Sequence, residues 1–195
     1  MSKPRIGVYV CQCGSNIAAT VDTEAVADFA KGLDGVVMTS VNKYSCSDPG
    51  QATIRKDIEE HNLERVVIAA CTPRMHEPTF RRTLESAGLN PYFLEMANIR
   101  EQVSWVHPEG EATTNKAMDL VAGAVERVPL QQALHSRKSP IEPSALVVGA
   151  GIAGIQAALD IADSGYKVYL VERAPTIGGR MAQLDKTFPT LDCST

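Results

Sequence analysis

Short apolar runs alternate with amphipathic segments along the first 130 residues of the chain. The apolar runs predict buried strands, at residues 5–10, 36–41, 65–70 and 92–95. Apolar positions at helical spacing predict helices between and after them, at residues 22–31, 49–62, 77–87 and 113–127. We expect Asp22 or Thr20 to cap the first helix and Asp48 the second. Strands that alternate with helices indicate a parallel sheet with crossover helices, so residues 1–130 are predicted to form an α/β sandwich.

A second α/β pattern follows a break in the periodicity. Residues 131–143 contain two prolines and few regularly spaced apolar positions, so we expect an interdomain linker there. Strands are predicted at residues 145–148 and 167–171, with a helix between them that ends near Asp163. This strand–helix–strand order over residues 144–195 predicts the N-terminal part of a Rossmann-like dinucleotide-binding domain that needs further strands to complete its sheet.

Composition and charge exclude several classes of protein. The chain has 195 residues, of which 44% are hydrophobic and 22% charged, as in globular proteins rather than disordered chains or coiled coils. Its 19 basic and 23 acidic residues leave a net charge of −4, without the basic excess that nucleic-acid binding needs. No apolar run approaches the ~20 residues of a membrane span, and the first residues lack a signal-peptide core. We therefore expect a cytoplasmic protein with no membrane span.

The cysteines carry the first candidate site. An odd number of cysteines, five, without a secretory signal argues against a disulfide framework. Cys11, Cys46 and Cys71 each fall at or just beyond the end of a predicted strand, and Cys13 follows Cys11 closely. Since the carboxyl ends of parallel strands share one edge of the sheet, we expect these four thiols to converge. Four thiolates suit either a 4Fe-4S cluster, which we favour, or zinc. The alternative is that they are small buried core residues.

Other polar and aromatic residues near this edge are weaker candidates. His76 could face the cluster, although such a histidine more often caps a helix start. Trp105 is expected in the core rather than as an electron relay. Residues 98–102 could pair charges at a domain interface or form a solvated helix turn. No Ser/His/Asp arrangement and no acid pair is placed for hydrolysis.

The second candidate site is the glycine-rich segment that follows the strand at 145–148. Gly149 allows a tight turn, Gly151 lets a pyrophosphate approach the backbone, and Gly154 allows close packing of helix on strand. The helix N-terminus offers free N–H groups to the phosphates. Glu172, at the end of the next strand, can accept hydrogen bonds from ribose hydroxyls. The predicted cofactor-binding residues are Gly149, Ala150, Gly151, Ile152, Ala153, Gly154, Glu172, Arg173, Gly178, Gly179 and Arg180.

Both FAD and NAD use such a unit. The acid at Glu172 is followed by the glycine pair Gly178-Gly179, which resembles the flavoproteins with two dinucleotide-binding domains. In those proteins the glycine pair supports the phosphate side of the flavin. We therefore expect FAD rather than NAD.

Taken together, these stretches resemble the A subunit of heterodisulfide reductase, which is an FAD and iron–sulfur polyferredoxin of methanogens and other anaerobes. The segments that carry the resemblance are residues 10–17, 44–50, 70–80, 98–105, 148–154 and 177–181. The resemblance implies a 4Fe-4S cluster on the four early cysteines, FAD on the glycine loop, and reduction of the coenzyme M–coenzyme B heterodisulfide or a related disulfide. It also implies that the flavin of some members bifurcates electron pairs toward ferredoxin and the disulfide.

The family resemblance also implies partners and a longer chain. The partners would be the heterodisulfide reductase B and C subunits, a hydrogenase or formate dehydrogenase that supplies electrons, and ferredoxin. Family members continue for several hundred residues beyond the length of this chain. Cys193 resembles the first cysteine of a further metal-binding pair, whose partner would lie three residues later, and some members carry selenocysteine near there. Our hypothesis is that a selenocysteine codon read as a stop ends the sequence here; the alternatives are a cloned domain or a truncated assembly. We expect the truncated chain alone to be inactive.

Two other functions remain open from the sequence. The chain could be a metal- and nucleotide-binding scaffold without enzymatic activity, or an NAD(P)-linked oxidoreductase. Flavin and iron in the purified protein would separate the electron-transfer flavoprotein from both.

Overall fold

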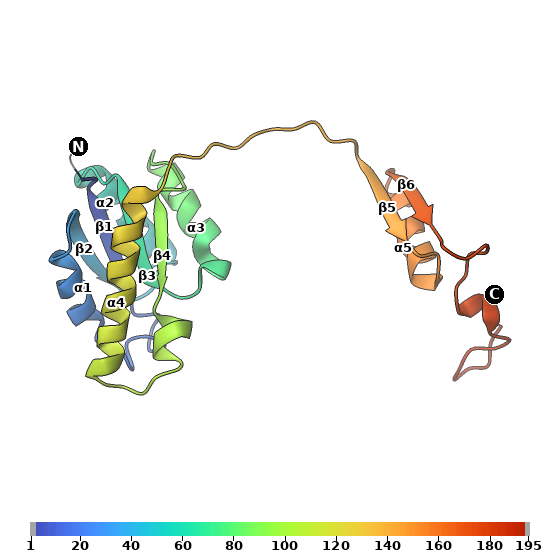
Figure 1. The fold of residues 1–195 in the computed structure, drawn as a ribbon, viewed down its shortest axis with the longest axis horizontal. Helices are drawn as coiled ribbons and strands as arrows, with labels where there is room; N and C mark the ends of the chain where they lie inside the picture. Colours follow the sequence, from blue (N-terminus) through green and yellow to red (C-terminus); the bar gives the residue numbers. More distant parts are fainter. Residues whose placement is uncertain (1–2, 194–195) are drawn as a thin grey trace. The chain divides into compact units, whose positions relative to one another are not determined.

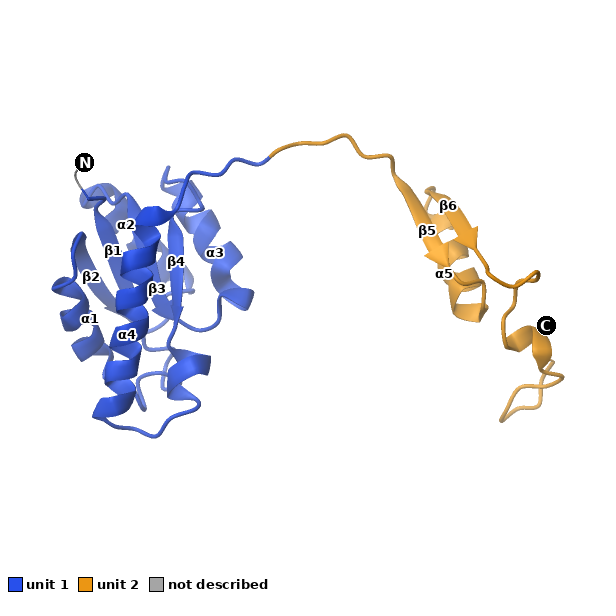
Figure 2. Cartoon of the chain, viewed as in Figure 1, with its two compact units in different colours: residues 1–136 blue, residues 137–195 orange. Residues whose placement is uncertain are grey.

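The computed structural model describes residues 3–193, which form two compact units, residues 1–136 and 137–195 (Figure 2). Residues 131–143, where a linker was predicted, form no helix or strand and are almost entirely exposed. The boundary between the two units falls within this stretch.

The first unit is built on a parallel four-stranded sheet (Figure 1). Its strands are β1 (Ile6–Cys11), β2 (Val36–Asn42), β3 (Arg65–Ala70) and β4 (Leu94–Asn98). The spatial order is β2-β1-β3-β4, so β1 lies between β2 and β3 and the chain reverses its direction of winding beside β1. The predicted α/β parallel-sheet fold is confirmed.

Helices cover both faces of this sheet and produce a separate apolar core on each. The helices are α1 (Thr23–Lys31), α2 (Asp48–Glu60), α3 (Pro73–Ser86) and α4 (Glu111–Arg127), with a π-helical turn η1 (Arg100–Ser104) and a 3₁₀ turn η2 (Val128–Leu130). Val8 and Val10 of β1 pack with α1 and α4, whereas Tyr9 and Cys11 pack with α2 and α3. Burial on both faces explains why the strands are continuous apolar runs.

Local hydrogen bonds determine where the helices begin. Asp22 caps α1 as predicted, since its carboxylate accepts from the Ala25 N–H at 3.0 Å. The prediction of Asp48 as the cap of α2 was wrong. Ser47 has the extended backbone of a cap and accepts from the Gly50 N–H at 3.3 Å, so Asp48 is already the first helical residue.

Two predicted boundaries shift for similar reasons. The helix predicted from residue 77 starts at Pro73, because Thr72 caps it and a proline suits the first helical position. The strand predicted at 92–95 is Leu94–Asn98, because Asn90 first forms a turn in which its side chain accepts from the Tyr92 N–H at 3.0 Å.

The second unit is a single strand–helix–strand motif with a short C-terminal extension (Figure 1). Its elements are β5 (Ser144–Val148), α5 (Ile152–Asp163), β6 (Lys167–Val171) and a 3₁₀ turn η3 (Met181–Gln183). β5 and β6 pair in parallel, with Ser144 opposite Lys167 and Val148 opposite Val171. Across the described residues of both units, the helices are too short or too polar to cross a bilayer.

Candidate cofactor sites

The four early cysteines of the first unit lie on loops at one edge of the sheet. Cys11 is the last residue of β1, Cys46 lies between β2 and α2, and Cys71 directly follows β3. Because β1 pairs with both β2 and β3, the three loops that leave these strands are neighbours. Sequence positions sixty residues apart, 11 and 71, are thereby brought to adjacent strand ends.

Backbone hydrogen bonds hold the first two of these loops together. The Gln12 N–H donates to the Asn42 carbonyl at 2.8 Å, and the Gly14 N–H donates to the Lys43 carbonyl at 3.2 Å. The Ser45 N–H donates to the Cys11 sulfur at 3.4 Å. The loop that carries Cys46 is therefore fixed against the loop that carries Cys13, and it supplies an amide donor to a sulfur.

Cys13 has an unusual backbone conformation. Its φ of 50° and the φ of 63° at Gly14 place two successive residues in the left-handed region. A non-glycine residue there is strained, and such strain concentrates at functional sites.

The four sulfur atoms are close enough to influence one another electrostatically. Burial raises the pKa of the Cys46 thiol, and the sulfurs of Cys11 and Cys13 raise it further. Burial raises the pKa of Cys71 to about 11, against an opposing effect of the Arg100 guanidinium. The raised pKa values make the Cys46 and Cys71 thiols harder to ionise, and a bound metal would have to displace their protons.

The spacing of the sulfurs is wider than a single ion requires. Within the part of the chain that the structure describes, one group of three potential ligands has its ligand atoms within 4.8 Å of one another, and it contains no cysteine. Zn–S bonds of about 2.3 Å in a tetrahedron would place the sulfurs about 3.8 Å apart. No three of the four cysteine sulfurs, all of which belong to the described residues, lie within 4.8 Å of one another.

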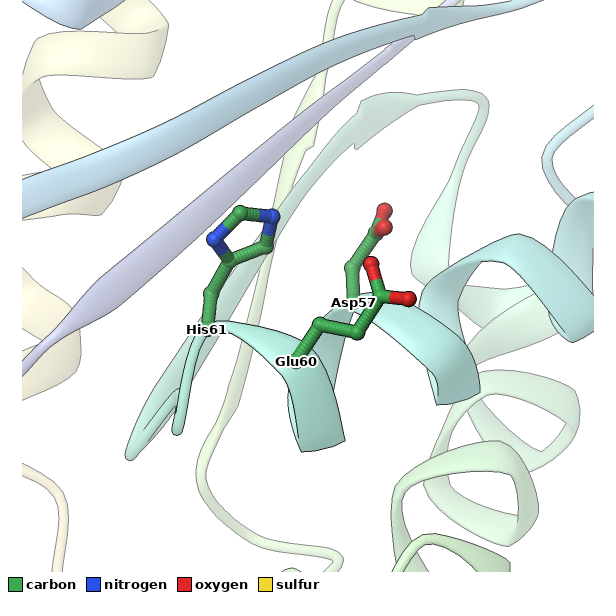
Figure 3. Close-up of side chains that lie close together, drawn as sticks. All are labelled: Asp57, Glu60 and His61. Carbon is green, nitrogen blue, oxygen red and sulfur yellow. The ribbon is translucent and has the colours of Figure 1, made fainter.

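That group of three is Asp57, Glu60 and His61, at the C-terminal end of α2 (Figure 3). Its members already make local contacts. Lys56 pairs with Glu60 at 3.4 Å, and the His61 N–H donates to the Asp57 carbonyl at 2.9 Å. Helix α2 runs away from the Cys46 loop toward this end, so the group belongs to the opposite edge of the sheet.

Arg100 is the charged residue that contacts the cysteine edge. Its Nη1 donates to the Cys13 sulfur at 3.2 Å, while Nε and Nη2 donate to one Glu101 carboxylate oxygen at 3.1 and 2.8 Å. Burial lowers the pKa of Arg100, but the hydrogen bonds to Glu101 and Cys13 outweigh it, and the pKa is raised. The guanidinium stays a cation beside the sulfurs.

The glycine loop of the second unit is shaped by close backbone contacts. Gly149, with φ of 100°, donates its N–H to the Val171 carbonyl at 2.7 Å. A β-carbon on Gly154 would overlap the Gly149 carbonyl oxygen. A β-carbon on Gly151 would meet nothing within 4 Å, so the space above this residue is open to a ligand. The fold thus requires glycine at position 154, whereas the space at 151 suits a pyrophosphate.

The carboxylate of Glu172 links the glycine loop after β5 to the turn after β6. One oxygen accepts from the Ala150 N–H at 2.8 Å and the other from the Ala174 N–H at 2.7 Å. The hydrogen bond from Ala174, and next that from Ala150, lower the pKa of Glu172. A carboxylate has about four acceptor positions, so this ionised group can still accept from ribose hydroxyls.

The glycine pair packs against the glycine loop. The Gly178 N–H donates to the Ala150 carbonyl at 2.7 Å, and a β-carbon on Gly179 would lie 3.0 Å from the Gly151 Cα. Both glycines have left-handed backbones, with φ of 103° and 58°. The structure therefore brings together two segments that the sequence predicted to serve one nucleotide.

Comparison with known proteins bears on the second unit and on the family of the whole chain. Residues 145–188 match the family model of FAD-dependent oxidoreductases. The chain is 61% identical over 193 residues to a CoB–CoM heterodisulfide reductase iron-sulfur A subunit of Methanopyrus kandleri, covering 98% of this chain and 29% of that protein. It is 59% identical over 195 residues to the H2:CoB–CoM heterodisulfide, ferredoxin reductase A subunit of Methanothermobacter thermautotrophicus, covering all of this chain and 30% of that protein. The chain belongs to the family of heterodisulfide reductase A subunits.

The chain spans about 30% of the length of these relatives. A further relative is the H2/formate:CoB–CoM heterodisulfide, ferredoxin reductase A subunit of Methanococcus maripaludis, 53% identical over all of this chain and 30% of its own length. The match to the FAD-dependent oxidoreductases confirms the prediction that the second unit begins a Rossmann-like FAD domain, and it supports FAD as the nucleotide.

The remaining predicted residues have different surroundings. Ile152 and Ala153 open α5, Arg173 directly follows Glu172, and Arg180 precedes η3. Cys193 belongs to the second unit. It is exposed, and its backbone forms an isolated antiparallel β-bridge with Lys186.

The predictions for Trp105 and the histidine need correction. Trp105 was predicted in the core, but it is 57% exposed, because it follows the π-helical turn and its ring lies 4.6 Å from the Arg100 guanidinium carbon. His76 does not cap a helix start: it lies in the first turns of α3, and Thr72 is the cap of that helix. Sequence reasoning missed Arg100 as a sulfur contact. The signal was its position just after β4, the fourth strand to end at this edge.

Proposed function

We propose that this chain forms the electron-transfer region of the A subunit in a heterodisulfide reductase-type complex, with a 4Fe-4S cluster in its first unit and FAD in its second. Cys11, Cys13, Cys46 and Cys71 would hold the cluster. The observation that carries the proposal is the convergence of these cysteines on three neighbouring strand-end loops. The two groups, when bound, would supply one-electron and two-electron chemistry. The chain's own side chains would bind, orient and shield them.

Sulfur ligands suit both zinc and an iron–sulfur cluster. Two other features of the first unit favour the cluster. The spacing of the sulfurs exceeds what one zinc ion requires. A backbone amide from Ser45 and a guanidinium from Arg100 also donate to the sulfurs. Such donors are the means by which proteins adjust the potential of a cluster.

In the second unit the predicted binding residues would divide the nucleotide between them. Gly151 and the first N–H groups of α5 would face the pyrophosphate, and Glu172 would accept from a ribose. The pair Gly178-Gly179 would support the phosphate side of the flavin, as it packs on the same loop. The match to FAD-dependent oxidoreductases supports FAD over NAD.

The activity of the whole protein is part of the proposal. The relatives are named for CoB–CoM heterodisulfide, for ferredoxin and for H2 or formate. We propose that the full-length protein works with the B and C subunits, ferredoxin and a hydrogenase or formate dehydrogenase, and passes electrons toward a heterodisulfide, with flavin-based bifurcation as one mode. The cytoplasmic location stays a prediction from the sequence.

Anaerobic purification of the full-length protein, with iron, sulfide and flavin analysis, tests the proposal. Cys46→Ala should lose the N-terminal cluster signal in electron paramagnetic resonance (EPR) spectra and keep FAD. Joint loss of both groups would contradict two separate sites. Thr53→Ala is the matched control: it removes a hydroxyl that donates to the Pro49 carbonyl within α2, and no ligand, so iron should be retained. Colourless protein that carries zinc would favour the scaffold function, and bound nicotinamide the NAD(P)-linked one.

A further inference from the structure

The contact between Arg100 and Cys13 extends the proposed function, on which this inference rests. We infer that Arg100 is a positioning residue that raises the reduction potential of the group held by the four cysteines. Reduction adds one electron, and thus one negative charge, to that group and its thiolates. A fixed cation at 3.2 Å from one of the sulfurs stabilises the more negative state.

The surroundings of Arg100 strengthen this effect. Its side chain is 17% exposed, so solvent screens the guanidinium less than it would a surface arginine. The hydrogen bond to sulfur is charge-assisted, and such bonds are stronger than those between neutral groups.

The position of the guanidinium is fixed from several directions. Glu101 accepts two of its N–H groups, and the Trp105 ring stacks on it at 4.6 Å. Glu101 is itself placed by its N–H, which donates to the Asn98 side chain at the end of β4 at 3.0 Å. The Ser104 N–H donates to the Ile99 carbonyl at 3.1 Å and closes the π-helical turn. A preorganised charge of this kind needs no rearrangement when the electron arrives.

The test is a redox titration of the full-length anaerobic protein, followed by EPR. The signal that Cys46→Ala abolishes identifies the N-terminal cluster among any others. In Arg100→Gln this signal should keep its intensity. The equilibrium constant for its reduction should fall on the order of tenfold, so its midpoint potential should become more negative by about 59 mV for one electron. Arg100→Lys retains the charge without the planar fork, so the cluster potential of this variant should lie between those of the wild type and Arg100→Gln.

Arg74→Gln is the matched control, because it removes the same charge from an exposed arginine three residues after Cys71. Its potential should equal that of the wild type.

An unchanged potential in Arg100→Gln with full iron content would overturn the inference. If Arg100→Gln loses iron, the titration is repeated with Arg100→Met, because this side chain keeps an apolar stem against Trp105. Iron loss in both variants would also overturn the inference, since Arg100 would then be needed for assembly. If Cys46→Ala removes no signal, the proposed cluster itself fails.

Discussion

Gly50, in the first turn of α2, lies against the backbone of Ser45 so closely that a β-carbon at Gly50 would be 2.7 Å from the Ser45 carbonyl oxygen and 2.8 Å from its Cα. Helix α2 therefore begins directly on the loop that carries Cys46 and that donates an N–H to Cys11. The small residue at position 50 links the packing of the helix to the geometry of the cysteine edge.

Gly50→Ala should therefore displace this loop. We expect a loss of about 1–3 kcal/mol in the free energy of unfolding, as for other overpacked sites, together with loss of iron. Chemical denaturation and iron analysis measure the two effects. Gly123→Ala is the control, because a β-carbon there meets nothing within 4 Å in α4 and should stabilise the helix by up to about 1 kcal/mol. Full iron content in Gly50→Ala would show that the loop tolerates the helix shift.

Two glycines of the nucleotide loop should respond differently to the same substitution. Gly151→Ala should leave folding unchanged and weaken FAD binding, because the added methyl group enters open space where the pyrophosphate is proposed to bind. Gly154→Ala should disturb the packing of α5 on the strand end, because its β-carbon overlaps the Gly149 carbonyl. Flavin content and thermal melting of the full-length protein distinguish the two. Equal flavin in wild type and Gly151→Ala would remove the pyrophosphate from this position.

The FAD affinity should depend on the ionisation of Glu172. Its hydrogen bonds to backbone N–H groups lower its pKa, so they stabilise the turn above the ordinary pKa of glutamate, and this contribution is lost as the pH falls through the lowered value. Glu172→Gln should weaken FAD binding on the order of tenfold at neutral pH, as expected for loss of hydrogen bonds to a charged group. Titration with FAD at several pH values should show the difference between the two proteins shrinking in acid. A difference that does not change with pH would assign the effect to shape rather than to charge.

Arg65 should be important for the stability of the first unit. Its guanidinium stacks on Phe93 at 3.6 Å and donates to the carbonyls of Val128 and Gln131 at 3.2 and 3.3 Å. Arg65→Lys should lose about 1–2 kcal/mol, because an ammonium group cannot make this stack and both contacts at once. Arg82→Lys, at an exposed position on α3, should be neutral in the same denaturation experiment. Equal losses in the two variants would show that the stack contributes little.

The sequence predicted the elements well wherever burial alone decides them. Runs such as 65–70 are buried on both faces of the sheet, so their apolar pattern is unambiguous. The convergence of Cys11, Cys46 and Cys71 followed from the same rule, since strand ends in a parallel sheet share an edge. The ends of helices that depend on one hydrogen bond were harder to predict. At the start of α2, for example, Ser47 and Asp48 are both residue types that cap helices well.

The sequence could not predict contacts that depend on the path of a loop. Trp105 has the composition of a core residue, yet the π-helical turn carries it to the surface, and no apolar periodicity marks such a turn. The same turn aims Arg100 at Cys13, 87 positions away in the chain. Neither relationship can be obtained from spacing, because each requires the tertiary placement of β4 beside β3.

The left-handed backbone at Cys13 has a consequence for the protein without the proposed cluster. A conformation that costs on the order of 1 kcal/mol persists only while its surroundings enforce it, and a bound metal would add to that enforcement because it ties the thiolate in place. Amide hydrogen exchange at Gly14, whose N–H is bonded to the Lys43 carbonyl, should accordingly quicken when iron is removed, so the stretch around Cys13 would register the presence of the cofactor as a local opening equilibrium.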